Sequence, residues 1–374
     1  MDCSHVFDSK VKRLIVVFTL FLAFFTVASP VFAQTDSVVV ATDSVVATAA
    51  EAPAEAEHHA THGEEKFEPT KVIMEHIADS HMWHLWGHTS LPLPVIVYTA
   101  NGLDFFSSGH FHHGEHDYTG NANTYRLVED KVKIVGADGK VDENAKVYDF
   151  SITKNVAAMF IAIAVILLVF ISVAGAYKTR AGKSPKGLQS FVEPIIVFVR
   201  DDIAKPNIGH NYGKFMPYLL TMFFFIWINN LMGLIPIFPG GANVTGNIAL
   251  TFVMALGTLL IVNLNGNKYY WKHIFAPDVP WWLYPIMVLV ELIGIISKPF
   301  ALMIRLFANI TAGHVIVLSL ISLIFIFQTL AIAPVSIAFV LFMDVLELLV
   351  AFLQAFIFTL LTALFIGMAV EEHH

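Results

Sequence analysis

Thiol chemistry is almost absent from this sequence. The 374 residues include one cysteine, Cys3, and it lies in a segment that we expect to be removed from the mature chain. A disulfide framework and thiol-based redox catalysis are therefore excluded. The sequence also lacks a glycine-rich loop followed by Lys and by Ser or Thr, which is the usual phosphate-binding signature of nucleotide hydrolases. Nucleotide hydrolysis by this chain alone is therefore excluded as well.

Charged residues are also scarce. They make up 14% of the chain, against 56% hydrophobic residues, and the mean hydropathy is +0.67. These values are typical of a protein with several membrane spans and exclude a soluble domain of this length. The net charge of −8 gives no indication of a nucleic-acid partner. We expect an all-α integral membrane protein with a small exported N-terminal region of α+β or β structure.

The first 33 residues have the order of a removable signal peptide. Three basic residues between positions 10 and 13 are followed by an apolar stretch, 14–27, and by small residues that end at Ala33. This is the order of a charged region, a hydrophobic region and a cleavage site. The alternative is an uncleaved first anchor helix, but the apolar stretch is short for a membrane span.

The part that follows the signal peptide is acidic. Residues 34–150 contain 19 Asp and Glu against 7 Lys and Arg, whereas residues 151–374 contain 9 against 12. Residues 34–65 have no aromatic side chain, and this composition is typical of a flexible tether. Residues 66–150 regain aromatic residues and turn signals, which indicate a small extracytoplasmic domain. Within it, we expect a β-hairpin in 125–152 whose turn lies at 136–139.

Histidine is concentrated in this front part, where 11 of the 17 histidines lie between His58 and His116. One group has the spacing of a single helical face and a second group lies close to Asp117. Such clusters can bind Zn²⁺ or Cu²⁺, but a solvated, proton-buffering surface and incidental composition are the alternatives. We assign no metal and no cofactor. The candidates are His81, His84 and His88 in the first group, and His110, His112, His113 and His116 in the second.

Three conventional spans are expected at about 155–177, 215–237 and 246–264. Basic residues follow the first span and the third, whereas the loop after the second has no Lys or Arg. The positive-inside rule then places the front part outside the cytoplasm. The remaining apolar length, 281–370, is divided by Pro334 alone. We expect it to form two long, strongly tilted helices joined near Pro334, with the C-terminus in the cytoplasm.

Polar residues in this apolar half fall on helical stripes. Arg305 is the most informative, because a guanidinium near mid-bilayer costs about 2.5–3.5 kcal/mol on insertion scales and therefore indicates function. At 100° per residue, Glu291 and Asn309 share its face, whereas His314 points the opposite way. A second stripe on the following helix consists of Asp344, Glu347 and Gln354.

The motifs around these residues resemble subunit a of F-type ATP synthases. The resemblance lies in SKPFALMIRLFANITAGH (297–314), ELLVAFLQAFIF (347–358), NNLMGLIP (229–236) and SPKGLQSFVEPIIVFVRDDIAKPNIG (184–209), and covers about 151–374. It implies that Arg305 faces a rotating ring of c subunits and keeps two offset proton half-channels from short-circuiting, with Asn309 beside it. His314 and Glu347 correspond to an interacting polar pair, in the reverse chain order of some members. Gln354 and Glu291 match further polar positions, and Asp344 matches less well.

The resemblance further implies a proton-conducting stator subunit of ATP synthase in a bacterial inner membrane. It would couple proton flow to rotation of the c-ring and to ATP synthesis, with the peripheral-stalk subunit b and the rest of the complex as partners. The main alternative is a secondary transporter or metal-ion exporter with a His-rich outer domain, but the internal repeats of such proteins are missing.

Several individual residues allow both a functional and a purely structural interpretation. Arg305 could snorkel to a lipid headgroup, and His314, Glu347 or Asp344 could be packing or structural polar groups. Lys298 fits a helix start or a helix interface better than a proton carrier. A further set of small polar residues fits either the lining of an outer channel or the contacts between helices. These are Asn229, Asn230, Asn243, Thr245 and Asn247.

Overall fold

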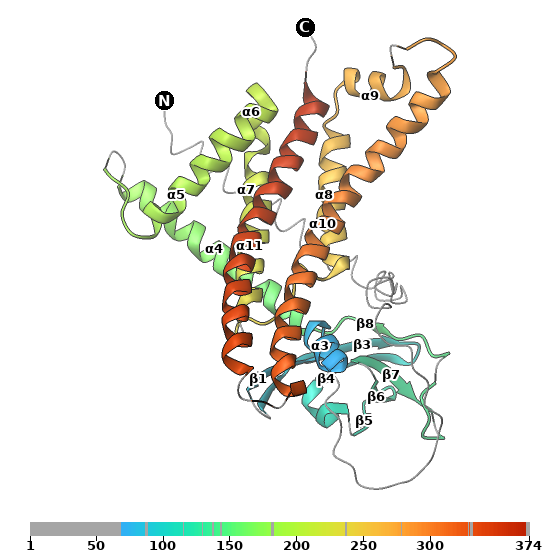
Figure 1. The fold of residues 1–374 in the computed structure, drawn as a ribbon. Helices are drawn as coiled ribbons and strands as arrows, with labels where there is room; N and C mark the ends of the chain where they lie inside the picture. The colour runs from blue at the N-terminus through green and yellow to red at the C-terminus, as the bar shows by residue number, and fades with distance from the viewer. Residues whose placement is uncertain are drawn as a thin grey trace.

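Helices and strands occupy separate parts of the chain. The computed structural model describes residues 69–371, apart from 87–88, 115, 129, 137, 143, 181–182, 236–237, 278, 328 and 330–331. The expected signal peptide (1–33) and tether (34–65) lie outside the described residues. An N-terminal β region, residues 69–152, sits at one end of a group of long helices, and the C-terminus lies at the other end (Figure 1).

The helical part begins directly after the β region. Among the described residues, four helical segments are long and apolar enough to cross a membrane, or up to five if the bent pair α8 and α9 is one span. The expected multi-pass helical membrane protein is thus confirmed, and long helices lie within a few residues of every expected span. The elements are α4 (Lys154–Thr179), α5 (Leu188–Phe198), the π-helix η2 (Val199–Ala204), α6 (Lys205–Ile208), the 3-10 helix η3 (Gly209–Asn211), α7 (Tyr212–Leu234), α8 (Ile248–Leu264), α9 (Lys268–Phe275), α10 (Tyr284–Phe327) and α11 (Ala333–Val370).

The segment from α5 to α6, for which the sequence analysis makes no structural prediction, is helical. Its apolar run is interrupted by Arg200, Asp201 and Lys205, so it does not have the composition of a span. In the fold, Asp201 accepts hydrogen bonds from Arg200 and pairs with Lys205, which leaves this charged group largely compensated within one turn of helix. Local ion pairing of this kind is not visible in a hydropathy profile.

Helices α10 and α11 form an antiparallel hairpin whose upper part opens outward (Figure 1). At 1.5 Å per residue, the 44 residues of α10 span about 66 Å, twice the thickness of a hydrocarbon core. The Ser336 hydroxyl of α11 donates a hydrogen bond to the Leu320 carbonyl of α10 near the turn. At the opposite end, a Cβ on Gly367 would lie 1.8 Å from the Asn207 carbonyl oxygen, so glycine is required where α11 crosses α6.

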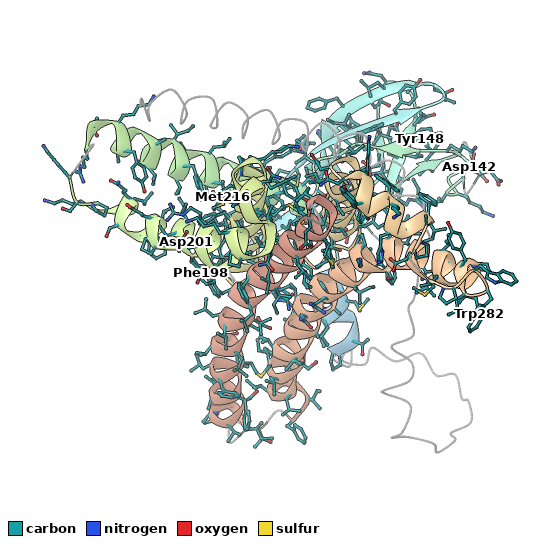
Figure 2. The ribbon with its side chains drawn as sticks, turned by 90° about the horizontal axis from the view of Figure 1, so that it is seen from above. Asp142, Tyr148, Phe198, Asp201, Met216 and Trp282 are labelled. Atoms are coloured by element: carbon teal, nitrogen blue, oxygen red, sulfur yellow. The ribbon has the colours of Figure 1, made fainter. Side chains whose placement is uncertain are left out.

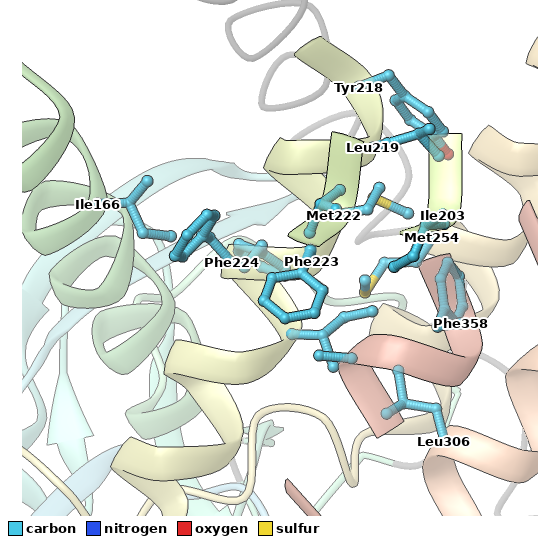
Figure 3. Packing of buried hydrophobic residues seen from close by; sticks show 14 of the residues in the cluster. Ile166, Ile203, Tyr218, Leu219, Met222, Phe223, Phe224, Met254, Leu306 and Phe358 are labelled. Carbon is cyan, nitrogen blue, oxygen red and sulfur yellow. The ribbon is translucent and has the colours of Figure 1, made fainter. Parts of the chain in front are cut away.

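The core of the helical part is formed by side chains from four helices. Figure 3 shows Phe223 of α7, Met254 of α8, Leu306 of α10 and Phe358 of α11 packed together. Each is at most 2% exposed. Because Leu306 belongs to this core, the opposite side of α10 is turned away from the bundle.

The N-terminal β region consists of a short helix and three small antiparallel sheets. Its sheets are β1-β2, β4-β3-β8 and β5-β6-β7. Val95, Phe106 and Tyr125 pack between the second and third sheets. The elements are α3 (Pro69–Ile77), β1 (Met82–Trp86), β2 (Thr89–Pro92), β3 (Pro94–Thr99), β4 (Gly102–Ser107), the 3-10 helix η1 (Ser108–Gly114), β5 (Tyr118–Thr119), β6 (Thr124–Val128), β7 (Lys131–Val135) and β8 (Tyr148–Asp149).

Two details of the sequence analysis were wrong here. The hairpin of this region joins β6 to β7 and reverses next to Asp130, which has a positive φ of 58°. The chain does turn at 136–139, but only an isolated bridge from Val135 to Val141 follows, and β8 pairs with β3 instead. His84 lies in strand β1, which pairs with β2, rather than on a helix. The expected helical His81, His84 and His88 face therefore does not form.

The β region is attached to α4 by buried polar contacts. The Asp79 carboxylate accepts hydrogen bonds from the Asn155 backbone N–H (3.0 Å) and the Thr153 hydroxyl (2.7 Å). It thus caps a helix that begins 75 residues later in the chain, where a negative charge is favourable. Burial, partly offset by these hydrogen bonds, raises the pKa of Asp79.

A buried histidine and an acidic residue lie beside this cap. His81 is 4% exposed, and its Nε2 lies 2.9 Å from the Asp149 carboxylate. Burial lowers the pKa of His81, but the hydrogen bond and charge of Asp149 outweigh it and leave the pKa raised. The pKa of Asp149 is lowered because the contact with His81 outweighs its own burial.

We predict that Asp79→Ala weakens the attachment of the β region to α4. The substitution leaves the Asn155 N–H and the Thr153 hydroxyl without an acceptor, a loss of about 1–3 kcal/mol. Proteolysis of the β region in intact membranes should accelerate by roughly 5- to 150-fold. The matched control is Asp142→Ala, which removes an exposed carboxylate that accepts a local hydrogen bond from Asn144. Equal cleavage of the two variants would contradict the prediction.

We predict that the β region itself loses stability as the pH rises above about 6.5, because the contact between His81 and Asp149 inside it weakens. The contribution of His81 is complete below its unfolded pKa of about 6.5 and is lost as the pH rises through its raised folded value. The contribution of Asp149 is complete above about pH 4 and is lost in stronger acid. Proteolysis rates between pH 6 and 9 measure this. His81→Gln should flatten the profile, whereas His110→Gln, at an exposed position, should leave it unchanged. A flat wild-type profile would refute the prediction.

Candidate functional site

Arg305 is exposed on the side of α10 that faces away from the helical core. Its neighbours Leu302 and Leu306 are buried in that core, at 2% and 1% exposure. No hydrogen bond or ion pair joins Arg305 to any residue that the structure describes. Since an arginine side chain remains charged at any physiological pH, its counter-charge must come from outside the described part of this chain.

A polar cavity lies beside α10 on the C-terminal side of Arg305. It is lined by Asn230 of α7, Asn309 and His314 of α10, and Glu347 of α11, together with aliphatic side chains. The helical azimuths placed Asn309 with Arg305 and apart from His314. In the fold, Asn309 lines the same cavity as His314, because the cavity follows the groove between α10 and α11 rather than one helical face. Arg305 does not line it.

Glycine at position 313 leaves room for the close approach of Glu347, whereas at Gly233 an added Cβ would make only an ordinary van der Waals contact with His314. A Cβ on Gly313 would lie 2.3 Å from Glu347 Oε1, and a Cβ on Gly233 would lie 3.7 Å from His314 Nε2. Glu347 Oε1 is buried and accepts no hydrogen bond from the described residues. Burying a carboxylate oxygen without a hydrogen-bond donor is unfavourable.

Asn230 holds the wall of this cavity. Its amide nitrogen donates to the Ala351 carbonyl of α11 (3.2 Å), and its amide oxygen accepts from the Thr245 hydroxyl (2.6 Å). Asn230 therefore connects helices and also lines the cavity. Both alternatives from the sequence analysis, a contact between helices and the lining of a polar space, apply to it. Asn229 instead donates to the Phe225 carbonyl of its own helix.

The other two polar residues of α11 lie on either side of Glu347. Asp344 is exposed one turn before it, and Gln354 is 4% exposed two turns after it. The structure thus places Asp344 on the open surface of the hairpin and Gln354 in the packed interior. Their positions differ because Gln354 lies where α7 covers α11.

A second cavity, with a mixed polar and apolar lining, lies on the N-terminal side of Arg305 along α10. Its lining includes Asn263, Tyr270, Lys298 and Pro299, and the Tyr270 hydroxyl donates to Asn263 Oδ1 (3.1 Å). Further along α10 in the same direction, Glu291 Oε1 lies 3.8 Å from His273 Nδ1 of α9.

Lys298 is therefore not at a helix start. It lies well inside α10, which begins at Tyr284, and its Nζ is 5.7 Å from the centre of the Phe365 ring on α11. The interpretation as an interface charge is the one that fits this contact.

The two cavities are offset along α10, with Arg305 between them. Pro299 lines one and Asn309 lines the other, a separation of about 15 Å at 1.5 Å per residue. Sequence reasoning missed Asn263, Tyr270 and Gly313. Asn263 and Tyr270 lie on different helices, so no periodicity connects them. The role of Gly313 depends on a side chain 34 positions away.

The histidines of the β region do not form a metal site among the described residues, where no group of three potential ligands occurs. His81 is paired with Asp149. His110 stacks on Tyr118 with ring centres 4.9 Å apart, and Asp117, next to His116, binds Arg126 at 2.6 Å. His88 lies outside the described residues, as do the side chains of His84, His112 and His113.

Long apolar helices, an exposed arginine on α10 and two cavities offset along that helix define a class of protein: an integral membrane protein with polar groups inside its spans. Comparison with known proteins makes this specific. A family model described as ATP synthase A chain matches residues 156–367. Residues 72–150 match a second model, Domain of unknown function (DUF8433).

Curated relatives agree with the first model. ATP synthase subunit a of Chloroherpeton thalassium is 49% identical over 60% of this chain and 69% of its own length. The subunit a of Chlorobium phaeobacteroides strain DSM 266 is 38% identical over 98% of this chain and 95% of its own. That of Myxococcus xanthus is 42% identical over 60% and 75%.

The chain belongs to the ATP synthase A chain family. Its function is therefore that of a proton-channel stator subunit of an F-type ATP synthase, as the motifs implied. The comparisons give no support to the alternative of a secondary transporter or metal-ion exporter.

We predict that Gly313→Ala impairs proton pumping whereas Gly294→Ala does not. The new methyl group at position 313 displaces the Glu347 carboxylate, while position 294 on the same helix has no atom within 4 Å of its Cβ. Displacement from a preferred rotamer costs on the order of 0.5–1.5 kcal/mol, or roughly 2- to 10-fold in rate. ATP-driven acidification of inverted vesicles measures both variants. Unimpaired pumping by Gly313→Ala would contradict the prediction that pumping depends on the close approach of Glu347 to α10 at position 313.

Proposed function

We propose that Arg305 separates two half-channels that correspond to the two offset cavities. The observation that carries the proposal is the position of Arg305 between these cavities along α10, lining neither of them. A proton that enters one cavity neutralises a carboxylate on a passing c subunit. The neutral carboxyl group can then face lipid, and it releases its proton into the other cavity after the ring has turned.

Arg305 enforces the coupling through electrostatics. An ionised carboxylate cannot face hydrocarbon at low cost, so it must be protonated or lie opposite a cation. The exposed position of Arg305, on the outer side of α10, supports a contact of this kind with a separate subunit. Arginine suits this role because it attracts carboxylates and does not give up its own proton.

The cavity with Asn309, His314 and Glu347 is proposed as the outer half-channel, since it lies toward the end of the helices that carries the β region (Figure 1). His314 and Glu347 are proposed to exchange protons there, with Asp344 and Gln354 as neighbouring polar positions on α11. Glu291, near His273, is proposed to belong to access from the opposite side.

The orientation follows from the charges near the helix ends. Basic residues Lys178 and Lys268 lie at the end of the bundle opposite the β region, which favours that end as the cytoplasmic side. We therefore propose an extracytoplasmic β domain (66–150), preceded by a cleaved signal peptide and a tether, and a cytoplasmic C-terminus in a bacterial inner membrane.

The chain is proposed to be non-catalytic on its own, with catalysis on partner subunits. The outer surface of the hairpin supports docking onto a ring of apolar helices. Phe300, Val345 and Leu349 are all more than half exposed there, which is unusual for a surface in contact with water. The c-ring is the proposed partner of this surface, and subunit b of the peripheral stalk is a further proposed partner.

We predict that Arg305→Ala and Arg305→Lys both abolish ATP-driven proton pumping. Alanine removes the charge, and a buried lysine has a different shape and can lose its proton. Arg305→Ala should also open a proton leak through the membrane sector after the catalytic head has been removed. Arg180→Ala, at an exposed position just after α4, is the matched control and should pump normally. Pumping at the wild-type rate by either Arg305 variant would overturn the proposal.

A further inference from the structure

One face of the β4-β3-β8 sheet is apolar and uncovered by any described element. Along β4 the side chains alternate, with Asp104 and Phe106 buried and Leu103 and Phe105 exposed. The exposed fractions are 62% for Leu103, 71% for Phe105 and 52% for Tyr98. Charge is absent from this face of the three strands. We call it the aromatic face; it consists of Ile96, Tyr98, Leu103, Phe105, Tyr148 and Phe150.

The pairing of the strands makes this face continuous. Tyr98 lies directly opposite Leu103 on one side and Tyr148 on the other, and the two tyrosine rings are 6.4 Å apart. Ile96 pairs with Phe105, and the Phe150 N–H donates to the Ile96 carbonyl. Six large side chains therefore form one patch rather than scattered apolar positions, and patches of this kind mark interaction surfaces.

The aromatic face lies next to the start of a membrane span. Phe150 precedes Lys154, the first residue of α4, by four positions, and the Lys154 N–H donates to the Ser80 carbonyl of the β region (2.8 Å). The β5-β6-β7 sheet packs on the opposite side of β3 and β4, at the end of the molecule farthest from the helices (Figure 1). The aromatic face is therefore on the side of the β region where α4 begins.

The sheet also extends sideways beyond the helices. In the view along the bundle, the strand that carries Tyr148 lies outside the footprint of the membrane helices, on the side away from the α10 and α11 hairpin (Figure 2). The neighbouring span is itself open to its surroundings, since Leu168 of α4 is 71% exposed and Ile171 is 59% exposed. No described element covers α4 at these positions.

We propose that the aromatic face rests on the headgroup region of the bilayer around the N-terminal end of α4. Tyrosine and phenylalanine have the chemistry for this location, because an aromatic body enters the acyl boundary while the tyrosine hydroxyl remains hydrated. The face thereby fixes the β region against the membrane beside the spans. This inference goes beyond the proton path and is independent of the role of Arg305.

The test uses single cysteines in the assembled ATP synthase complex, in a Cys3→Ser background and reconstituted into phosphatidylcholine vesicles. Leu103→Cys and Phe105→Cys place a polarity-sensitive fluorophore on the aromatic face. Lys131→Cys, at an exposed position of β7 in the distal sheet, is the matched control. Quenching is measured with a nitroxide carried near the lipid headgroup and, separately, with iodide on both sides of the vesicle. ATP-driven pumping verifies that each labelled complex is assembled.

The labels at 103 and 105 should be quenched several-fold more by the lipid-borne nitroxide than the label at 131, and several-fold less by iodide. Iodide quenching equal to that of position 131 would show a face in water and would overturn the proposal. Protection from both quenchers would show that a protein covers the face, and this outcome would overturn it as well.

Discussion

A permanent charge on a surface in contact with hydrocarbon needs a counter-charge, and this constraint organises the membrane part of the molecule. Arg305 occupies the outer side of α10, while Leu302 and Leu306 hold the inner side in the core. Packing thus leaves the guanidinium no partner within the described chain. The helix bundle can be stable only where an acidic group of another subunit, or a lipid headgroup, satisfies this charge. In the proposed function, the same residue also couples proton flow to rotation of the ring.

Small residues decide where the other polar groups lie. Glu347 reaches α10 because position 313 has no side chain. Small residues bring helices close in a membrane, and here they also define the wall of a cavity. A single residue also determines the junction between the β region and α4. There, Asp79 supplies the hydrogen-bond acceptor that the first turn of α4 lacks.

Much of the fold was predictable from hydropathy alone. The expected spans lie within a few residues of α4, α7 and α8, and the long apolar stretch after them forms the hairpin of α10 and α11. The features of the fold that hydropathy and spacing did not predict have particular causes. The segment from α5 to α6 carries charges that pair locally around Asp201. The spacing of His81, His84 and His88 fits one face of a helix. His84 nevertheless lies in β1, because this segment pairs with β2 as a strand.

The sequence by itself determined the class of protein, its family motifs and the residues that carry charge into the membrane, because hydropathy and short motifs are local properties. The tertiary structure decided which of those residues meet. It brought Asn309 and His314 to one cavity, joined Asn263 to Tyr270 across two helices, and set the two cavities about 15 Å apart along α10. These relations depend on how helices distant in sequence cross, and the position of a crossing is fixed by contacts such as Gly367 against Asn207, which no periodicity encodes.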